Sequence, residues 1–291
     1  MPANGDGFDS RMIAGVIRHY NAAPQPELLG LSPDQVAQLL DGDWRTTGAV
    51  RINQRLPRER VNTMWAWRAA LDLLRLVRDE GPAPVTATGN LTRKFVARAL
   101  EAVKFPPEYV GDIRRFSRVL NEPDVPRLLY LRQTLVGAGW LRRHRGFRVT
   151  SRGLALLESG QDEPGPDLAR LFLARMGVTG GFLDNEGRVF RSPLGPALFL
   201  LSRRAATWVD SLDLTDRLLI PSLLPEESPG QLGLLAYQWV LRPCLEFGLA
   251  ERKGGPNVLD PERVRITSSF PELVRFHFVD GDGRPDLRLV R

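Results

Sequence analysis

The 291-residue chain contains, twice, a helix that ends at glycine and is followed by two short strands and a serine, and this repeat is its most constraining feature. The first copy reads GAGWLRRHRGFRVTSRG and the second reads EFGLAERKGGPNVLDPERVRITSSF. A hairpin that follows a helix through a short, glycine-containing loop is typical of a winged helix-turn-helix domain. The repeat therefore predicts a mainly α protein of the α+β class with two such domains in tandem.

The elements around the first copy fit one domain. Apolar residues recur at helical spacing over 60–78, and 85–100 reads as a short extended piece, a Gly-Asn turn and a second helix. A third helix is predicted from Pro126 to about Ala138. The hairpin strands are predicted at 140–143 and 147–150, with a closing helix over 151–158.

Three regions follow from these patterns: a helical N-terminal extension (1–58), a first winged-helix domain (59–160) and a second one (161–291). The polar, Gly- and Pro-rich stretch 160–166 marks the boundary between the two domains. In the extension, Ser32 and Pro33 predict the start of a helix that runs to Leu40. The second domain is expected to have helices at 197–208, 214–224 and 231–247, strands at 248–252 and 264–267, and a last strand at 287–290.

Positive charge is concentrated in the first domain. Residues 91–153 contain 14 Lys and Arg against 5 Asp and Glu, a net charge of +9 in a chain whose total is +6. The remainder of the chain is therefore slightly acidic. A clustered excess of this kind attracts a polyanion such as DNA.

The candidate contacts with nucleic acid lie on the third helix and the hairpin. In a winged helix that binds in the usual way, the third helix enters the major groove and the hairpin lies over a flanking groove or the backbone. The rival interpretation is that these side chains only solvate an exposed surface. The predicted site consists of Arg127, Arg132, Gln133 and Thr134 on the helix and Arg142, Arg143, His144, Arg145 and Arg148 on the hairpin.

The second domain is expected to behave differently. Its third helix is rich in Leu, Tyr and Trp and has Arg242 as its one charge before Glu246. Burial suits such a helix better than contact with DNA, so this domain is predicted to support self-association, a protein partner or a fixed arrangement of the two domains.

Other classes of protein are disfavoured. No run of apolar residues is long enough for a membrane span, and the N-terminus lacks a signal peptide, which predicts a cytoplasmic protein. A single cysteine, Cys244, rules out an intramolecular disulfide and a zinc cluster of cysteines. The three histidines have no matching carboxylate spacing, so no metal, cofactor or enzymatic activity is expected.

Three short segments also carry a resemblance. They are Gly30-Leu-Ser-Pro33, Val85-Thr-Ala-Thr-Gly-Asn-Leu91 and Arg242-Pro-Cys-Leu-Glu-Phe-Gly-Leu-Ala-Glu251. At these positions the chain resembles a group of uncharacterised bacterial proteins, some of them joined to a plasmid-type open-reading-frame-three-like domain. Cys244 departs from the leucine usual in that group. The resemblance implies a fold and no activity.

The function expected from the sequence is binding of double-stranded DNA by the first domain, driven by arginine-phosphate contacts and counterion release. Regulation of transcription, or a role in mobile-element or defence biology, would follow from such binding. The alternative is a non-enzymatic scaffold or adaptor whose winged helices bind protein partners.

Overall fold

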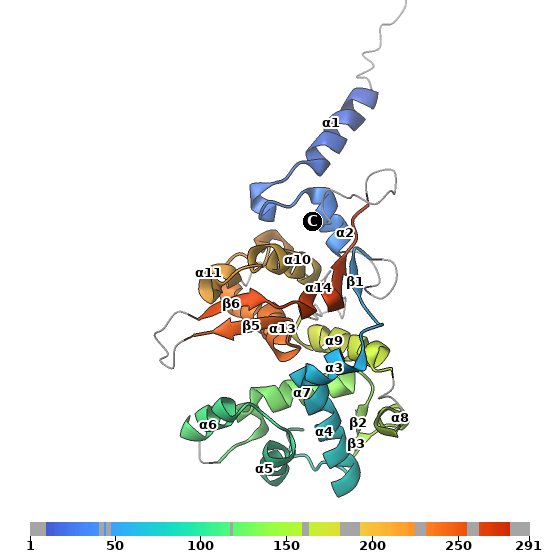
Figure 1. Ribbon diagram of the computed structural model, residues 1–291, viewed down its shortest axis with the longest axis vertical. Helices are drawn as coiled ribbons and strands as arrows, with labels where there is room; N and C mark the ends of the chain where they lie inside the picture. Colours follow the sequence, from blue (N-terminus) through green and yellow to red (C-terminus); the bar gives the residue numbers. More distant parts are fainter. Residues whose placement is uncertain are drawn as a thin grey trace, which may run out of the picture.

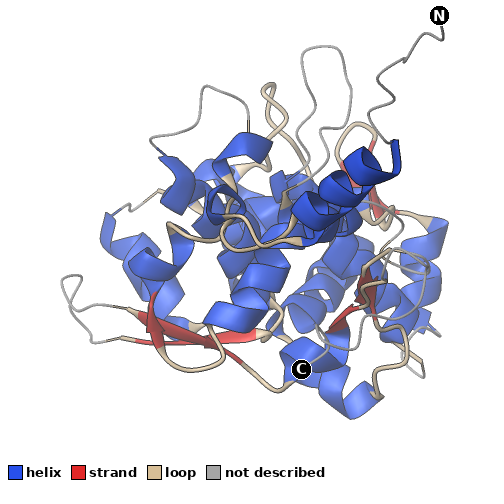
Figure 2. Cartoon of the chain, turned by 90° about the horizontal axis from the view of Figure 1, so that it is seen from above, coloured by secondary structure: helices blue, strands red, loops and turns tan. Residues whose placement is uncertain are grey.

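The computed structural model of this protein describes residues 10–40, 44, 48–116, 119–158, 163–180, 193–224, 231–254 and 262–279. It is mainly helical with three small sheets, which confirms the predicted α+β class (Figure 2). The tandem winged-helix arrangement and the domain boundaries stay predictions. The expected last strand at 287–290 lies outside the described residues.

The N-terminal region contains α1 (Ser10–Ala22), a 3-10 turn (Pro26–Leu28), α2 (Pro33–Leu40) and β1 (Val50–Ile52). The predicted start of α2 is confirmed, because Ser32 Oγ accepts a hydrogen bond from the Gln35 amide (3.2 Å) while Gln35 Oε1 accepts one from the Ser32 amide (2.8 Å). This reciprocal pair is a capping box. Helix α1 projects from the rest of the chain (Figure 1).

The middle region begins with two consecutive helices, α3 (Arg58–Thr63) and α4 (Trp65–Glu80), where the sequence predicted one. Helices α5 (Arg93–Ala102) and α6 (Pro107–Phe116) follow. The predicted third helix is α7 (Pro126–Gly137), the hairpin is β2 (Leu141–Arg143) with β3 (Phe147–Val149), and the closing helix is α8 (Ser151–Glu158), as expected.

The C-terminal region begins with α9 (Gly165–Gly180), α10 (Leu194–Arg204), β4 (Val209–Asp210) and α11 (Ser211–Thr215). A continuous helical path follows through α12 (Leu232–Ala236), a π-helical turn (Tyr237–Leu241) and α13 (Arg242–Glu246). The last described elements are β5 (Ala250–Lys253), β6 (Arg263–Ile266), α14 (Ser269–Leu273) and β7 (Val274–Phe276). The helix predicted at 214–224 is wrong, since α11 ends at Thr215 and only a 3-10 turn (Pro221–Leu223) lies beyond it.

All strand pairs in the three sheets are antiparallel. Strand β2 pairs with β3, and β1 pairs with β7 from the opposite end of the described chain. The third sheet has the order β4-β6-β5. An isolated bridge between Ala83 and Phe147 adds a minimal strand next to β3, so both the middle and C-terminal sheets place their first strand beside their last.

The regions on either side of residue 160 share one apolar core. Helix α9 lies along α7 across the middle of the molecule (Figure 1). On its other side α9 contacts the π-helical turn and α13. One helix is therefore held between the helices that precede the two hairpins.

Candidate nucleic-acid interface

Two glycines with positive φ shape the β2–β3 hairpin, one just before its first strand and one in its loop. Gly139 ends α7 with φ +76°, and Gly146 has φ +128° in a position where a Cβ would lie 2.7 Å from the Ala83 carbonyl oxygen. Leu141 and Phe147 point into the core at 2% and 3% exposure. Alternation along each strand then directs Arg142 and Arg148 to solvent.

The exposed face of the hairpin carries like charges in direct register. Arg142 lies opposite Arg148 on this face. Arg143, His144 and Arg145 are also exposed, but Arg143 is paired with Phe147 and so lies on the other face of its strand. No described carboxylate forms an ion pair with the four arginines. Like charges directly opposite one another destabilise a strand pair, so this face is electrostatically strained without an anion.

The tip of the hairpin contains a second unfavourable feature. Arg145 has φ +51°, in the left-handed region that a side chain with a Cβ rarely adopts. The conformation costs about 1–2 kcal/mol relative to right-handed backbone. Non-glycine residues in such conformations concentrate at functional sites.

A hollow of about 640 Å³ lies near the hairpin. Besides Leu91, Pro123 and the Asp124 carboxylate, it is lined by polar and cationic side chains, among them Thr86, Thr88, Asn90, Thr92, Arg93 and Lys94. The Arg143 guanidinium covers the turn at Gly89, since a Cβ on this glycine would lie 2.8 Å from its Nη1. Arg143 thus connects the hollow with the hairpin, and we call the two together the wing surface.

Two of the four α7 residues that were predicted to contact nucleic acid are buried. Arg132 is 8% exposed and Thr134 is 2% exposed. The Arg132 guanidinium donates to both carboxylate oxygens of Glu122, itself fully buried, and lies 4.5 Å from the centre of the Phe147 ring. The Thr134 hydroxyl donates to the Tyr130 carbonyl oxygen at 2.7 Å. Neither side chain is available to a nucleic acid in this structure.

The other two helix residues are half-buried. Arg127 lies over the Trp65 and Tyr109 rings, 5.5 and 4.5 Å from their centres, and burial lowers the pKa of its guanidinium. Gln133 also has restricted exposure. The five predicted hairpin residues are thus all exposed, whereas the four on α7 are buried or half-buried: Arg132 packs against Glu122 and the Phe147 ring, and α9 covers another side of the helix.

Glu122 has a structural role that the sequence pattern did not predict. Besides Arg132, its carboxylate accepts a hydrogen bond from the Leu91 amide at 2.8 Å. This one side chain connects α7 to the segment that leads into α5 and, through Arg132, to Phe147 beside the loop of the hairpin. No signal in the sequence relates two residues ten positions apart on different elements.

A second buried ion pair holds α9 between the two hairpin-bearing regions. Arg175 on α9 donates to Glu246 on α13 at 2.7 Å, and Arg242 donates to the same carboxylate at 3.3 Å. Both guanidiniums lie over the ring of Tyr130 on α7, at 4.9 and 5.0 Å. The charged side chains Arg242 and Glu246 of α13 therefore make their contacts within the protein.

Among the residues that the structure describes, no group of three or more His, Cys, Asp or Glu could hold a metal ion. None of the helices described is long and apolar enough to cross a membrane. Cys244 is buried, and burial raises the pKa of its thiol.

Comparison with known proteins gives a match to a family model that spans the wing surface. Residues 63–162 match the family model described as the Y4jL N-terminal domain. The chain is 39% identical over 75 residues to the uncharacterized protein y4jL of Sinorhizobium fredii, which is 25% of this chain and 34% of that protein. The chain thus covers about a third of the length of this relative.

No solved structure matches the chain. The two matches support a relation to an uncharacterised bacterial family, and the match to the family model spans the region from α4 to α8. The predicted relation to proteins with a plasmid-type open-reading-frame-three-like domain finds no support in these matches and stays a prediction.

Proposed function

We propose that the protein binds double-stranded DNA through the wing surface, by contacts to the phosphate backbone. The observation that carries this proposal is the register of Arg142 and Arg148, two exposed cations held opposite each other with no described carboxylate to neutralise them. A row of phosphates would relieve the repulsion, and release of condensed counterions would favour the complex.

The winged-helix interpretation is supported by the order of elements. In the middle region a helix, a minimal strand at Ala83, two helices, the helix α7 and a hairpin follow one another, with the first strand next to the last. The C-terminal region repeats this outline with α10, β4, α11, the helical path of 232–246 and the hairpin β5–β6. Both regions are proposed to be winged helices.

The proposed mode of binding differs from the usual one in leaving out the third helix. Arg132 and Thr134 are buried and α9 lies along α7, so base edges in the major groove are out of reach. Phosphate contacts position a protein without reading sequence. The proposed binding is therefore weakly dependent on base sequence, which suits a protein that coats or bridges DNA better than one that selects an operator.

Fluorescence anisotropy against a random 24-base-pair duplex, measured over a series of salt concentrations, tests the proposal. Replacing Arg142 and Arg148 with Ala removes two cations, so the slope of log K against log salt should fall by about 2, at roughly 0.9 per phosphate. The matched control is Lys253→Ala with Arg263→Ala, another cross-strand cation pair on the β5–β6 hairpin. Its slope should change by less than half as much.

Three outcomes would contradict the proposal or its mode of binding. Absence of binding at low salt would exclude DNA and leave the scaffold or adaptor function, with protein partners, as the remaining candidate. An equal loss in both double variants would mean that net charge, rather than the wing surface, determines binding. A strong preference for one duplex sequence would show that α7 becomes exposed in the complex.

A further inference from the structure

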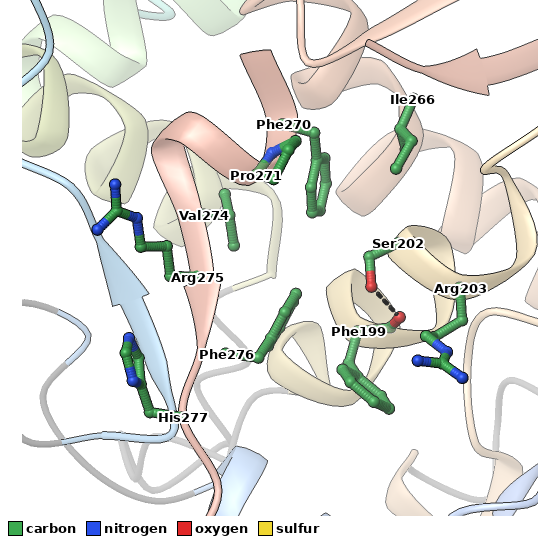
Figure 3. Close-up of a pocket in the computed structure, with 10 residues that line it drawn as sticks. All are labelled: Phe199, Ser202, Arg203, Ile266, Phe270, Pro271, Val274, Arg275, Phe276 and His277. Carbon is green, nitrogen blue, oxygen red and sulfur yellow. Dashed lines mark hydrogen bonds between the residues drawn. The ribbon is translucent and has the colours of Figure 1, made fainter. Parts of the chain in front are cut away.

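A groove of about 370 Å³ opens in the C-terminal region, away from the wing surface. Figure 3 shows its two long sides, formed by the end of α10 and by β7. Ile266, Phe270 and Pro271 close it between them, and Phe199 and Ser202 face it from α10. The groove is independent of the proposed DNA contacts, because it shares none of their residues.

The groove follows the edge of a strand rather than its face. Four consecutive residues, Val274 to His277, line it. Successive side chains of a strand point to opposite faces, so a hollow that touches all four must run along the strand edge. In Figure 3 the β1 strand lies on the other side of β7, which leaves this edge toward the groove.

The register identifies the backbone groups on that edge. The Asn53 amide donates to the Leu273 carbonyl oxygen at 2.8 Å, and the His277 amide donates to the Ala49 carbonyl oxygen at 2.7 Å. Hydrogen-bonded pairs alternate along an antiparallel ladder, so Val274 and Phe276 direct their polar backbone groups away from β1. The Val274 amide bonds to the Phe270 carbonyl oxygen. The Val274 carbonyl and both polar groups of Phe276 have no hydrogen bond to any described residue.

One face of this edge offers apolar contact. The Phe199 and Phe276 rings meet edge to face with centres 5.1 Å apart, and Phe270 stacks with Phe276 at 6.5 Å. Phe199 and Phe270 are 6% and 1% exposed, so the aromatic wall is fixed by the core. A large apolar side chain that lay in the groove would gain contact with a surface that is already ordered.

The opposite face of the same edge is cationic. Arg51 and Arg275 are exposed and lie directly across from each other on β1 and β7. His277 follows on the same face, and its own burial, Arg51 and Arg275 lower the pKa of its imidazole. No described carboxylate pairs with Arg275. An acidic side chain placed beside this face would therefore be attracted to it.

We propose that this groove binds an extended peptide that adds a strand to β7, with large apolar side chains on the groove side alternating with acidic side chains beside Arg51 and Arg275. Strand addition of this kind takes affinity from main-chain hydrogen bonds and specificity from alternate side chains. The three unpaired backbone groups of Val274 and Phe276 are the bonds available to the peptide. The partner is thus a protein that presents an extended segment with alternating acidic and apolar residues.

Selection from a random octapeptide phage library on the full-length protein tests this proposal. Peptides with alternating acidic and large apolar residues should be enriched. Ser202→Trp places an indole in the groove and should weaken the selected peptides at least tenfold. Ala206→Trp, at an exposed position just beyond α10 and outside the groove, is the matched control and should bind as the unmodified protein does.

Two further measurements test the proposal without the Ser202→Trp variant, in case that variant does not fold. Peptide binding should slow hydrogen exchange of the Phe276 amide, and N-methylation of alternate peptide bonds on the strand-facing side should weaken binding at least tenfold. No enriched peptide, or enriched peptides that tolerate N-methylation, would overturn strand addition. Protection of Phe276 that grows with protein concentration alone would assign the edge to a second copy of the chain and would also overturn it.

Discussion

Replacing a member of the Arg132–Glu122 ion pair tests directly whether the Arg132 side chain of α7 stabilises the core or binds a ligand. The two side chains are 10% and 0% exposed, so Arg132→Met leaves a buried carboxylate with the Leu91 amide as its remaining donor. Breaking a buried pair by removing one partner costs about 3–5 kcal/mol. We expect a loss of that size in the free energy of unfolding, measured by urea titration with Trp fluorescence.

A double variant and a control separate this loss from a general effect of the substitution. Replacing both partners, as Glu122→Gln with Arg132→Met, removes the uncompensated charge and should recover most of the loss. Arg142→Met makes the same change on the exposed hairpin and should stay within about 0.5 kcal/mol of the unmodified protein. If Arg132→Met lost less than about 1 kcal/mol yet reduced DNA affinity more than Arg142→Met did, the assignment of Arg132 to the core would be refuted.

Three further predictions concern packing, the cysteine and the hairpin tip. Gly195→Ala should lower the free energy of unfolding by about 1–3 kcal/mol or more through overpacking, because the new Cβ would lie 2.0 Å from the Leu39 carbonyl oxygen. Gly177→Ala, whose Cβ would have nothing within 4 Å, should raise that free energy by about 0.5–1 kcal/mol. Urea titration of both variants measures the two changes, and equal effects would contradict the close approach of α10 to α2. Cys244 should resist a thiol-specific reagent at pH 8 in the folded protein and react fully in denaturant, because burial raises its pKa; a fast reaction in the folded state would mean that the thiol is accessible. Arg145→Asn should keep or raise stability while weakening DNA binding, since Asn tolerates the left-handed backbone at φ +51°; unchanged anisotropy would remove Arg145 from the wing surface.

Local signals in the sequence were enough to locate many of the elements. Ser32 and Pro33 begin α2 because the serine hydroxyl caps the first turn, and Gly139 ends α7 in the conformation that glycine favours. The prediction at 214–224 failed for a different reason. Leu214, Leu218 and Leu219 are all buried at helical spacing, yet the Asp210 side chain caps a short helix that ends at Thr215. Burial without a continuous helix gives the same pattern of apolar residues.

The candidate site was predictable only where it depends on a hairpin. Alternation along two short strands places Arg142 and Arg148 on one exposed face, and that is a local property of the sequence. The burial of Arg132 depends on Glu122 and on the Phe147 ring, and α9 covers another side of α7 from beyond the predicted domain boundary. Polar residues on a helix do not reveal whether another helix lies against them. Tertiary packing therefore decided which half of the predicted site is accessible.

The position of α9 also bears on how the chain folds and on its relatives. Helix α9 contacts both α7 and α13, so unfolding of one hairpin-bearing region would expose the apolar surface that the other buries against α9. Heating should therefore produce a single cooperative transition. The stretch that matches the Y4jL N-terminal domain ends at residue 162, before α9 begins. A relative that shares only this stretch must shield the corresponding helix with a different part of its own chain or leave it open to a ligand. Under the DNA-binding function proposed above, such proteins would differ in whether they read base sequence, according to what lies against this one helix.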